Sequence, residues 1–547
     1  ISDSADVKST DNKFNLSGEG NNGILVKSGK LTSTGSANTG FFLNGTGITK
    51  SNGINNQGGD VDVRSEHFTI AGSENNGIYT KTGTVNVKST VYSVGGTSLN
   101  NGVFLNNTAI LEDESSTYNV SGNQNNGIYN NGTGNVTVKD PTVTVTGDQN
   151  NGIYNTSTSA TGTVKVERSS LRGGNDFEVS GTNNNGILTN GTGDLKVTKI
   201  TFNVNGTTTN NPGDQNNAIY QKGNAQVEID NSIFTVGGRD NNAVLGKGAK
   251  ALDIKGGTTF TVTGNENNGV HLDGTKTTTA YTDTGSVFTL DSNATNSNAI
   301  YAKKGAVELK GTTVTLNGNN NNGLIVFKKT DVTPVKVGKN GNDRSSFVVN
   351  SNNNGIFATG GSSIDEINGA NFDVNGSAIG LLVGDSDGNN KAEVAKLEEA
   401  TFDVKDTNSA DTSDKTGTGI YMYEGEITTN GKVKMEGDSN DIFVTIYNQK
   451  NNKITFGGTD AEQILAGTKT SPTDGNNIAF NLQKGDTSKI QQIDLITDGT
   501  NKKGVDIAFY GNGNNAYKVN SFVGTLNIIN GKDAVAGTIG KDNLSSD

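Results

Sequence analysis

The feature that most constrains the fold is a short string, Asn-Asn-Gly-Ile-Tyr, that returns at fixed intervals. Its glycine stands at positions 77, 127 and 152, and a Val-Phe variant has its glycine at 102, so the step is 25 residues three times in succession. Related strings occur on both sides, for example Asn-Asn-Gly-Ile at residues 21–24 and 353–356. A period of roughly 20–50 residues is the signature of a solenoid or an array. The chain is therefore expected to fold as a stack of similar units, although its length alone would suggest three or four globular domains.

Each unit contains three short strings in which apolar and polar residues alternate. In one unit they are residues 128–129, 136–138 and 143–145, and their β-branched and aromatic residues are typical of half-buried strands. The third string is the most regular, with an aromatic residue two positions before an aliphatic one. It occurs at Phe68/Ile70, Phe177/Val179, Phe202/Val204, Phe234/Val236, Phe260/Val262, Phe288/Leu290, Phe347/Val349, Phe372/Val374 and Phe402/Val404.

Two β architectures can use such strands. Asn-Gly between alternating strings favours hairpins, and hence antiparallel sheets or propeller blades. Here, however, about four polar residues separate the third string from the glycine, and one identical turn per three strands does not suit four-stranded blades. A coil of three short strands that pairs with its neighbours fits the count. We therefore predict an all-β fold, a right-handed parallel β-helix with three strands per coil of about 25 residues.

In this fold the Asn-Asn-Gly string is expected to form a stacked corner of each coil. Glycine and asparagine adopt the left-handed backbone conformation at low cost, which would explain Gly77. Asparagine side chains in successive coils can also hydrogen-bond to each other along the stack. The string is thus interpreted as structural rather than as a ligand-binding motif.

Composition limits the classes of function. Only 31% of the residues are hydrophobic, which is typical of disordered chains, but these residues are gathered in alternating strings that can stack. The net charge of −12 disfavours nucleic acid and anionic lipid as partners. The absence of cysteine excludes disulfides, thiolate metal sites and a cysteine nucleophile. No apolar run reaches the length of a membrane span, and no signal peptide opens the chain.

The regular spacing fails at intervals where extra residues are inserted. The insertions fall at residues 155–175, 206–213, 273–285, 327–346 and 384–416. From about residue 384 the Asn-Asn-Gly string decays as well. The predicted organisation is a regular β-helix over 1–383 and a degenerate continuation over 384–547. Binding residues tend to lie on loops that leave a rigid scaffold, so these intervals are the places to look for function.

Catalytic chemistry finds little support. The two histidines, His67 and His271, are far apart, and the five arginines are dispersed. β-Helical polysaccharide lyases and glycosidases need clustered carboxylates, which could still form across coils. The stretch Asp385–Asn389 resembles a calcium loop, but a plain polar turn is the favoured interpretation. We therefore expect no enzyme activity, no cofactor and no metal, and leave open whether Asp385 and Asp387 bind calcium.

Candidate binding residues are basic or aromatic residues in the irregular intervals. The 327–346 insertion is basic in an acidic chain and could contact an acidic or sialylated partner. Tyrosines in the 273–285 loop and near the 384–416 interval could stack on a sugar ring. For every one of them a solvated loop or ordinary packing is the competing interpretation. The candidates are Tyr281, Phe327, Lys328, Lys329, Arg344, Tyr421 and Tyr423.

The Asn-Asn-Gly-Ile-Tyr, Thr-Val-x-Val and Phe-x-Val-x-Gly strings resemble the passenger domains of type V autotransporters. Their Asn-, Lys- and Gly-rich texture is most similar to the very large fusobacterial outer-membrane adhesins, over nearly the whole chain. The resemblance implies a passenger segment displayed on the surface of a Gram-negative bacterium and anchored through a C-terminal membrane β-barrel outside this sequence. It also implies adhesion to galactose-type host glycans, to receptor proteins or to other bacteria. It transfers no site residue.

Two alternatives to an adhesin remain open on sequence grounds. One is a β-helical polysaccharide lyase or hydrolase. The other is a spacer stalk whose binding tip lies elsewhere in a longer chain. The ligand, the binding loops and the oligomeric state are not determined by the sequence.

Overall fold

The computed structural model describes most of the chain up to residue 430 and eight separate strands beyond it, β48–β55. The gaps before residue 430 are residues 3, 37, 160–161, 172, 207–214, 275–279, 329–330, 332–333, 386–389 and 406–417. The chain divides into two compact units, Ile1–Thr275 and Lys276–Asp547. The described residues of both units form β-strands and no helix.

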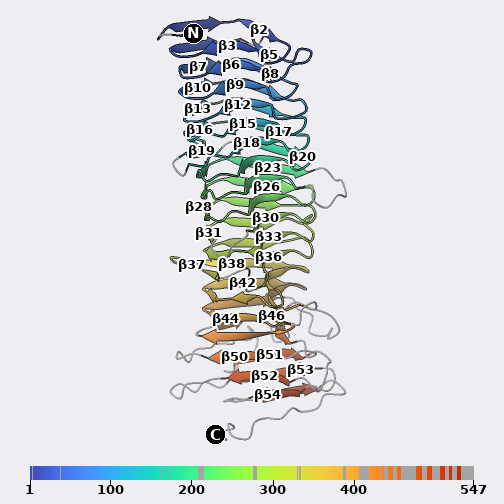
Figure 1. The fold of residues 1–547 in the computed structure, drawn as a ribbon. Coiled ribbons are helices and arrows are strands. Elements are labelled where there is room, and N and C mark those ends of the chain that lie inside the picture. Colours follow the sequence, from blue (N-terminus) through green and yellow to red (C-terminus); the bar gives the residue numbers. More distant parts are fainter. Residues whose placement is uncertain are drawn as a thin grey trace. The chain divides into compact units, whose positions relative to one another are not determined.

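The strands up to β49 belong in turn to three parallel sheets, here called sheets I, II and III, so that each of these coils contributes to all three; the coils stack along each unit (Figure 1). In the first unit, sheet I contains β1 (Asp6–Thr10), β4 (Lys30–Thr34), β7 (Asp60–Arg64), β10 (Thr84–Lys88), β13 (Ile110–Glu114), β16 (Val136–Lys139), β19 (Val164–Glu167), β22 (Leu195–Thr198), β25 (Val227–Asp230) and β28 (Leu252–Lys255). Sheet II contains β2 (Lys13–Leu16), β5 (Gly40–Leu43), β8 (His67–Ile70), β11 (Val91–Val94), β14 (Thr117–Val120), β17 (Thr142–Val145), β20 (Phe177–Gly181), β23 (Thr201–Gly206), β26 (Ile233–Gly237) and β29 (Thr259–Val262). Sheet III contains β3 (Asn22–Val26), β6 (Asn52–Asn56), β9 (Asn76–Thr80), β12 (Asn101–Leu105), β15 (Asn126–Asn130), β18 (Asn151–Asn155), β21 (Asn185–Thr189), β24 (Asn217–Gln221), β27 (Asn242–Gly246) and β30 (Asn268–Asp273).

The second unit repeats this order as far as β49, and beyond it the described strands alternate between sheets I and III. Its sheet I contains β31 (Ala280–Thr284), β34 (Ala306–Lys310), β37 (Val335–Asn340), β40 (Ser363–Ile364), β41 (Glu366–Asn368), β44 (Ala392–Glu398), β47 (Gly425–Asn430), β50 (Lys453–Gly457), β52 (Ile490–Leu495) and β54 (Ala516–Val519). Sheet II contains β32 (Val287–Leu290), β35 (Thr313–Leu316), β38 (Asp343–Asn350), β42 (Ala370–Asn375), β45 (Ala400–Lys405) and β48 (Val433–Glu436). Sheet III contains β33 (Asn298–Lys304), β36 (Asn322–Val326), β39 (Asn354–Ala358), β43 (Ile379–Val383), β46 (Thr418–Met422), β49 (Ile442–Ile446), β51 (Asn476–Leu482), β53 (Val505–Gly511) and β55 (Leu526–Asn530).

The repeat length sets the register between coils. Strand β12 pairs in parallel with β9 and with β15, so that Asn101 lies opposite Asn76 on one side and Asn126 on the other. Where the step lengthens between Gly152 and Gly186, the register is kept, and Asn151 still pairs with Asn185. These pairings confirm the predicted parallel β-solenoid with three strands per coil. The domain boundary near residue 384 stays a prediction.

The core is a stack of aromatic rings supplied by sheet II. In the first unit Phe41, Phe68 and Tyr92 are buried, and their neighbouring ring centroids are 4.9 Å apart with nearly parallel planes. In the second unit the rings of Phe347, Phe372 and Phe402 stack at 5.1 and 4.5 Å. The spacing equals the distance between neighbouring strands, about 4.8 Å. The Phe-x-Val strings therefore point their aromatic residue into the core.

The Asn-Asn-Gly string does not use its glycine as predicted. Gly77 lies within β9, and the left-handed residues are Gly72 and Glu74, at the corner that precedes the string. A Cβ atom on Gly77 would lie 2.6 Å from the carbonyl oxygen of Gly102 and 3.1 Å from the ring of Phe68. Glycine is thus required because β9 lies close both to the neighbouring strand β12 and to the aromatic rings of sheet II, which leaves no room for a side chain. The prediction that Gly77 adopts the left-handed conformation is wrong.

The predicted asparagine ladders are confirmed, and each string supplies two of them. The second asparagines bond side chain to side chain, with Asn101 Nδ2 donating to Asn76 Oδ1 at 2.8 Å. The first asparagines are buried, and Oδ1 of Asn100 accepts from the backbone N–H of Asn75 at 3.0 Å. The Nδ2 of Asn75 donates to the corner carbonyl of Ala71 at 2.6 Å. The amides thus fix the corner both within a coil and between coils.

Candidate functional site

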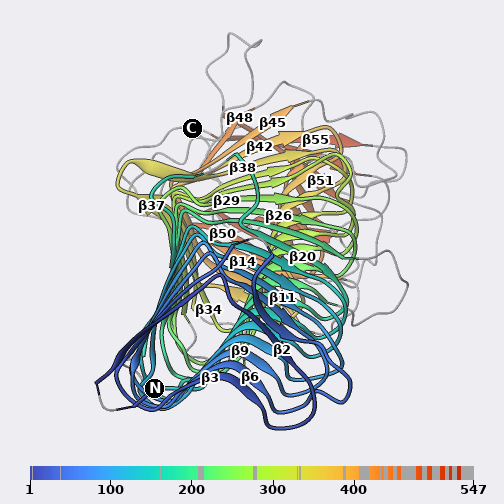
Figure 2. The same ribbon diagram turned by 90° about the horizontal axis from the view of Figure 1, so that it is seen from above.

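One irregular coil of the second unit contains a hairpin. Strands β37 and β38 pair in an antiparallel manner at Lys339–Arg344 and Asn340–Asp343, before each strand joins its parallel sheet. Gly341 has a φ of 61°, which permits the tight turn between them. The hairpin lies within the predicted 327–346 insertion and projects outward from its coil (Figure 2).

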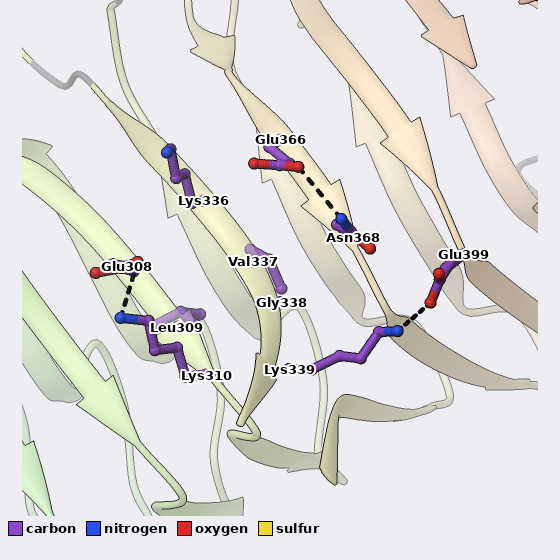
Figure 3. Close-up of a pocket in the computed structure, with 10 residues that line it drawn as sticks. All are labelled: Glu308, Leu309, Lys310, Lys336, Val337, Gly338, Lys339, Glu366, Asn368 and Glu399. Carbon is purple, nitrogen blue, oxygen red and sulfur yellow. Dashed lines mark hydrogen bonds and ion pairs between the residues drawn. The ribbon is translucent and has the colours of Figure 1, made fainter. Parts of the chain in front are cut away.

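Beside this hairpin, the outer face of sheet I is hollowed into a charged groove of about 350 Å³ (Figure 3). Outward positions of β34, β37 and β41 lie side by side in it, with Glu308 opposite Lys336 and Lys336 opposite Glu366. Glu399, which directly follows β44, also lines the groove. A second row runs from Lys310 to Gly338. The hollow is explained by Gly338, because a Cβ atom there would meet only the carbonyl oxygen of Asn368, at 3.3 Å. The lining residues are Glu308, Leu309, Lys310, Lys336, Val337, Gly338, Lys339, Glu366, Asn368 and Glu399.

Carboxylates in and beside the groove pair with its lysines. Lys396 Nζ lies 2.9 Å from Glu366 and 2.6 Å from Glu398, and Lys310 lies 2.9 Å from Glu308. The hydrogen bond from Lys396 lowers the pKa of Glu366, and the bond to Glu398 is the main cause that raises the pKa of Lys396. Glu366 is therefore ionised at neutral pH.

The hairpin is tied to the groove through Glu399. Lys339 donates a hydrogen bond to Glu399 Oε2, and this bond lowers the pKa of Glu399. Arg344 donates to the backbone carbonyl of Glu399 at 2.7 Å and to Asn371 Oδ1 at 3.4 Å. Two basic residues of the insertion, Lys339 and Arg344, thus share one acidic partner, Glu399, which lies about 60 residues after Lys339 in the chain. This pairing weakens the expectation of an acidic partner at this point.

A second depression, here called the amide depression, lies where sheet II turns toward sheet III and has a volume of about 850 Å³. Its lining contains no ionisable side chain. Asn375 Nδ2 donates to Asn350 Oδ1 in the lining, and Asn350 Nδ2 donates to Asn317 Oδ1 beside it, both at 2.9 Å. The lining residues are Asn319, Asn350, Ser351, Asn352, Asn375, Gly376 and Ser377.

The structure places two of the predicted tyrosines in the core. Tyr281 is 0% exposed and lies in β31, where its hydroxyl contacts Asp283 Oδ2 at 3.4 Å. The prediction that Tyr281 lies in the 273–285 loop is wrong, because Ala280–Thr284 form a strand whose alternate side chains are buried. Tyr421 is 3% exposed within β46. Neither ring can stack on a ligand that approaches from solvent.

The remaining predicted residues lie near the surface but are not gathered at one point. Phe327 and Lys328 directly follow β36 in sheet III; Phe327 is half-buried and packs 5.0 Å from Tyr301, whereas Lys328 is exposed. Arg344 lies in the hairpin, beside sheet I. Tyr423 follows β46 and is half-buried. Lys329 lies outside the described residues, so its role stays a prediction.

Sequence reasoning missed the amide depression altogether. Asn350, Ser351 and Asn352 directly follow the Phe347/Val349 string, in the polar stretch that separates each third string from the glycine of its Asn-Asn-Gly. The signal was a run of amides at the end of the third strand, Asn317, Asn350 and Asn375, repeated in three successive coils. Sequence reasoning also missed Glu366, Lys396 and Glu399, whose pairing depends on contacts between coils.

Other functional features can be stated only for the described residues. Among them, no group of three or more histidine, aspartate or glutamate residues could hold a metal ion. Asp385 accepts a hydrogen bond from the backbone of Gly360 at 2.8 Å, while Asp387 lies outside the described part. No helix among the described residues could cross a membrane.

Comparison with known proteins yields little. No protein-family model and no curated sequence matches this chain. Among solved structures, a chain in "The cryo-EM structure of the Vag8-C1 inhibitor complex" is similar, with a TM-score of 0.38 and 12% identity, over 98% of this chain and 100% of that chain. A TM-score this low carries no argument about function. The solenoid fold is therefore established by the strand pairing of this chain itself.

Proposed function

We propose that this chain is a segment of a bacterial cell-surface adhesin of the autotransporter passenger type. It would attach the cell to host glycans, to receptor proteins or to other bacteria. The observation that carries the proposal is the presence of two shallow polar depressions on the outer surface of the second unit, both built on paired parallel strands. Surfaces of this kind suit a large ligand that docks from outside, because the scaffold holds the contacting side chains in place.

The charged groove favours binding over glycoside hydrolysis. A hydrolase of this class needs one carboxylic acid whose pKa is raised so that it can protonate the leaving group. In the groove the pKa values of Glu366 and Glu399 are instead lowered by their lysine partners. Asp113, whose pKa is raised to about 7, is buried in the core of the first unit. These carboxyls are poor candidates for a general acid.

The proposal is tested by competition for cell attachment. The purified 547-residue chain should inhibit attachment of the parent bacterium to host cells or to partner bacteria in a saturable manner. A charge-matched unrelated protein serves as the control. Absence of inhibition at saturating concentration would instead favour a spacer stalk, whereas release of reducing or unsaturated sugars from a polysaccharide panel would favour an enzyme.

A further inference from the structure

We infer that the amide depression of the second unit binds a neutral, hydroxyl-rich oligosaccharide. This inference deepens the proposed adhesin function and rests on it. It differs from the expectation of an acidic or sialylated partner, which was attached to the basic 327–346 insertion. The reasons lie in the charge, the hydrogen-bonding capacity and the spacing of the groups that line the depression.

The lining of the depression is uncharged. Its side chains are amides and hydroxyls, whereas the groove on sheet I contains six ionisable residues, among them Lys336 and Glu366. An anionic ligand in the amide depression would lose hydration without meeting a cation in the lining. A neutral ligand incurs no such cost. The lining therefore selects against carboxylated and sulfated sugars.

Each rung of the amide ladder retains hydrogen-bonding capacity for a ligand. A primary amide has two N–H donors and two lone pairs on oxygen. Asn350 uses one N–H toward Asn317 and one lone pair toward Asn375, which leaves one donor and one acceptor. A hydroxyl group is itself both donor and acceptor, so it can satisfy both at once. A carboxylate can only accept hydrogen bonds, so it would leave the free lone pair of the amide oxygen without a donor.

The ladder is fixed before a ligand arrives. Asn350 and Asn375 end strands β38 and β42, which pair directly from Ser345–Ala370 to Asn350–Asn375. Successive rungs are about 4.8 Å apart, so three rungs span roughly 10 Å. A volume of about 850 Å³ is comparable with that of small-ligand sites. The depression can thus take a few sugar residues at a small cost in side-chain ordering.

The inference is tested by isothermal calorimetry on the full chain with neutral oligosaccharides of two to six hexoses and with versions that carry a terminal carboxylated sugar. We expect saturable binding of at least one neutral oligosaccharide and at least tenfold weaker binding of its carboxylated counterpart. The double variant Asn350→Ala/Asn375→Ala should lose at least tenfold in affinity. Asn86→Ala is the matched control, because Asn86 donates an exposed bond of the same 2.9 Å length between coils of the first unit.

A second variant guards against misfolding. Asn350→Asp keeps the shape of the side chain and its bond from Asn375, but it loses both N–H donors, the one toward Asn317 and the one left for a ligand. Because Asn350 is only half-buried, this variant should keep the melting temperature within a few degrees and still lose affinity for the neutral ligand. Equal binding by wild type and both variants, preference for the carboxylated sugar, or no binding at all would overturn the inference. If the chain competes for cell attachment while the double variant competes equally well, the adhesin proposal survives and the assigned site fails.

Discussion

At the residue scale, the Asn-Asn-Gly string requires glycine because there is no room for a Cβ atom, and not because the backbone has a positive φ. A Cβ atom on Gly102 would lie 2.6 Å from the carbonyl oxygen of Gly127 and 3.2 Å from the ring of Tyr92. Because Gly127 lies in β15, which pairs with β12, its carbonyl cannot move without disturbing the backbone hydrogen bonds between these strands. The glycine of the string is therefore required because sheet III packs closely against the aromatic rings of sheet II.

We expect Gly102→Ala to destabilise its unit by roughly 1–3 kcal/mol, the usual range for overpacking. Denaturant unfolding followed by far-ultraviolet circular dichroism measures the change. Gly173→Ala is the matched control, since nothing lies within 4 Å of a Cβ atom there. Equal stability of the two variants would show that the close approach is not rigid.

Asp113 is the buried ionisable residue with the clearest consequence for pH. Its carboxylate accepts hydrogen bonds from Ser116 Oγ at 2.5 Å and Tyr118 Oη at 2.8 Å, yet burial raises its pKa to about 7. An unfolded aspartate has a pKa of about 3.9, so the folded state binds the proton more tightly. The contribution of Asp113 is present in full below about pH 4 and is lost as pH rises to about 7.

Asp113→Asn should remove this pH dependence. Relative to the variant, the wild type should lose stability between pH 4 and pH 7, by up to about 4 kcal/mol. The measurement is the difference in unfolding free energy across that range. Glu112→Gln, an exposed neighbour, is the control and should leave the slope unchanged. A wild-type stability that rises over this range, relative to Asp113→Asn, would refute a protonated Asp113.

At the scale of the strand, the amide ladders join one coil to the next. Asn101 is 4% exposed; it donates to Asn76 and accepts from Asn126 Nδ2 at 2.9 Å. Removing its amide leaves a buried acceptor on one side and a buried donor on the other. Each unsatisfied group costs about 1–3 kcal/mol.

Asn101→Ala is accordingly expected to destabilise the first unit by several kcal/mol. Asn86→Ala should cost less, because Asn86 is exposed and its partner Asp62 can hydrogen-bond to water instead. Amide hydrogen exchange of β9, β12 and β15 would localise the effect. Exchange that rises equally in distant coils, or not at all, would argue against a ladder that acts between neighbours.

The ion pair between Arg344 in the β37–β38 hairpin and Glu399 is expected to contribute less to stability than the buried amide ladders do. Arg344 and Glu399 are about one-third to one-half exposed, and their side chains lie 3.8 Å apart. Exposed ion pairs contribute about 0–1 kcal/mol. Arg344→Ala should therefore change the melting temperature little but raise amide exchange at the hairpin tip, with Arg64→Ala in the first unit as a control. A large loss of stability would mean that the hairpin is part of the core of its unit.

At the scale of the whole chain, the sequence was sufficient for the architecture. The 25-residue step and the Phe-x-Val strings determined the parallel pairing and the aromatic core, because strand registers repeat with the sequence. The sequence was not sufficient to predict which side chains meet on the surface or which lie in the core at the insertions. Tyr281 was assigned to a loop although its strand merely follows an insertion, and the pairing of Lys339 with Glu399 joins residues from different coils. Side chains that are brought together only by stacking leave no local sequence signal.

The most direct test of function is hydrogen–deuterium exchange on the full chain with and without the neutral oligosaccharide that it binds most tightly. Protection is expected for peptides that cover 345–353 and 370–378, where the amide depression lies, and not for those that cover 306–310 and 335–340 in the charged groove. Protection confined to the groove, or to the first unit, would contradict the assignment of the ligand site to the amide depression.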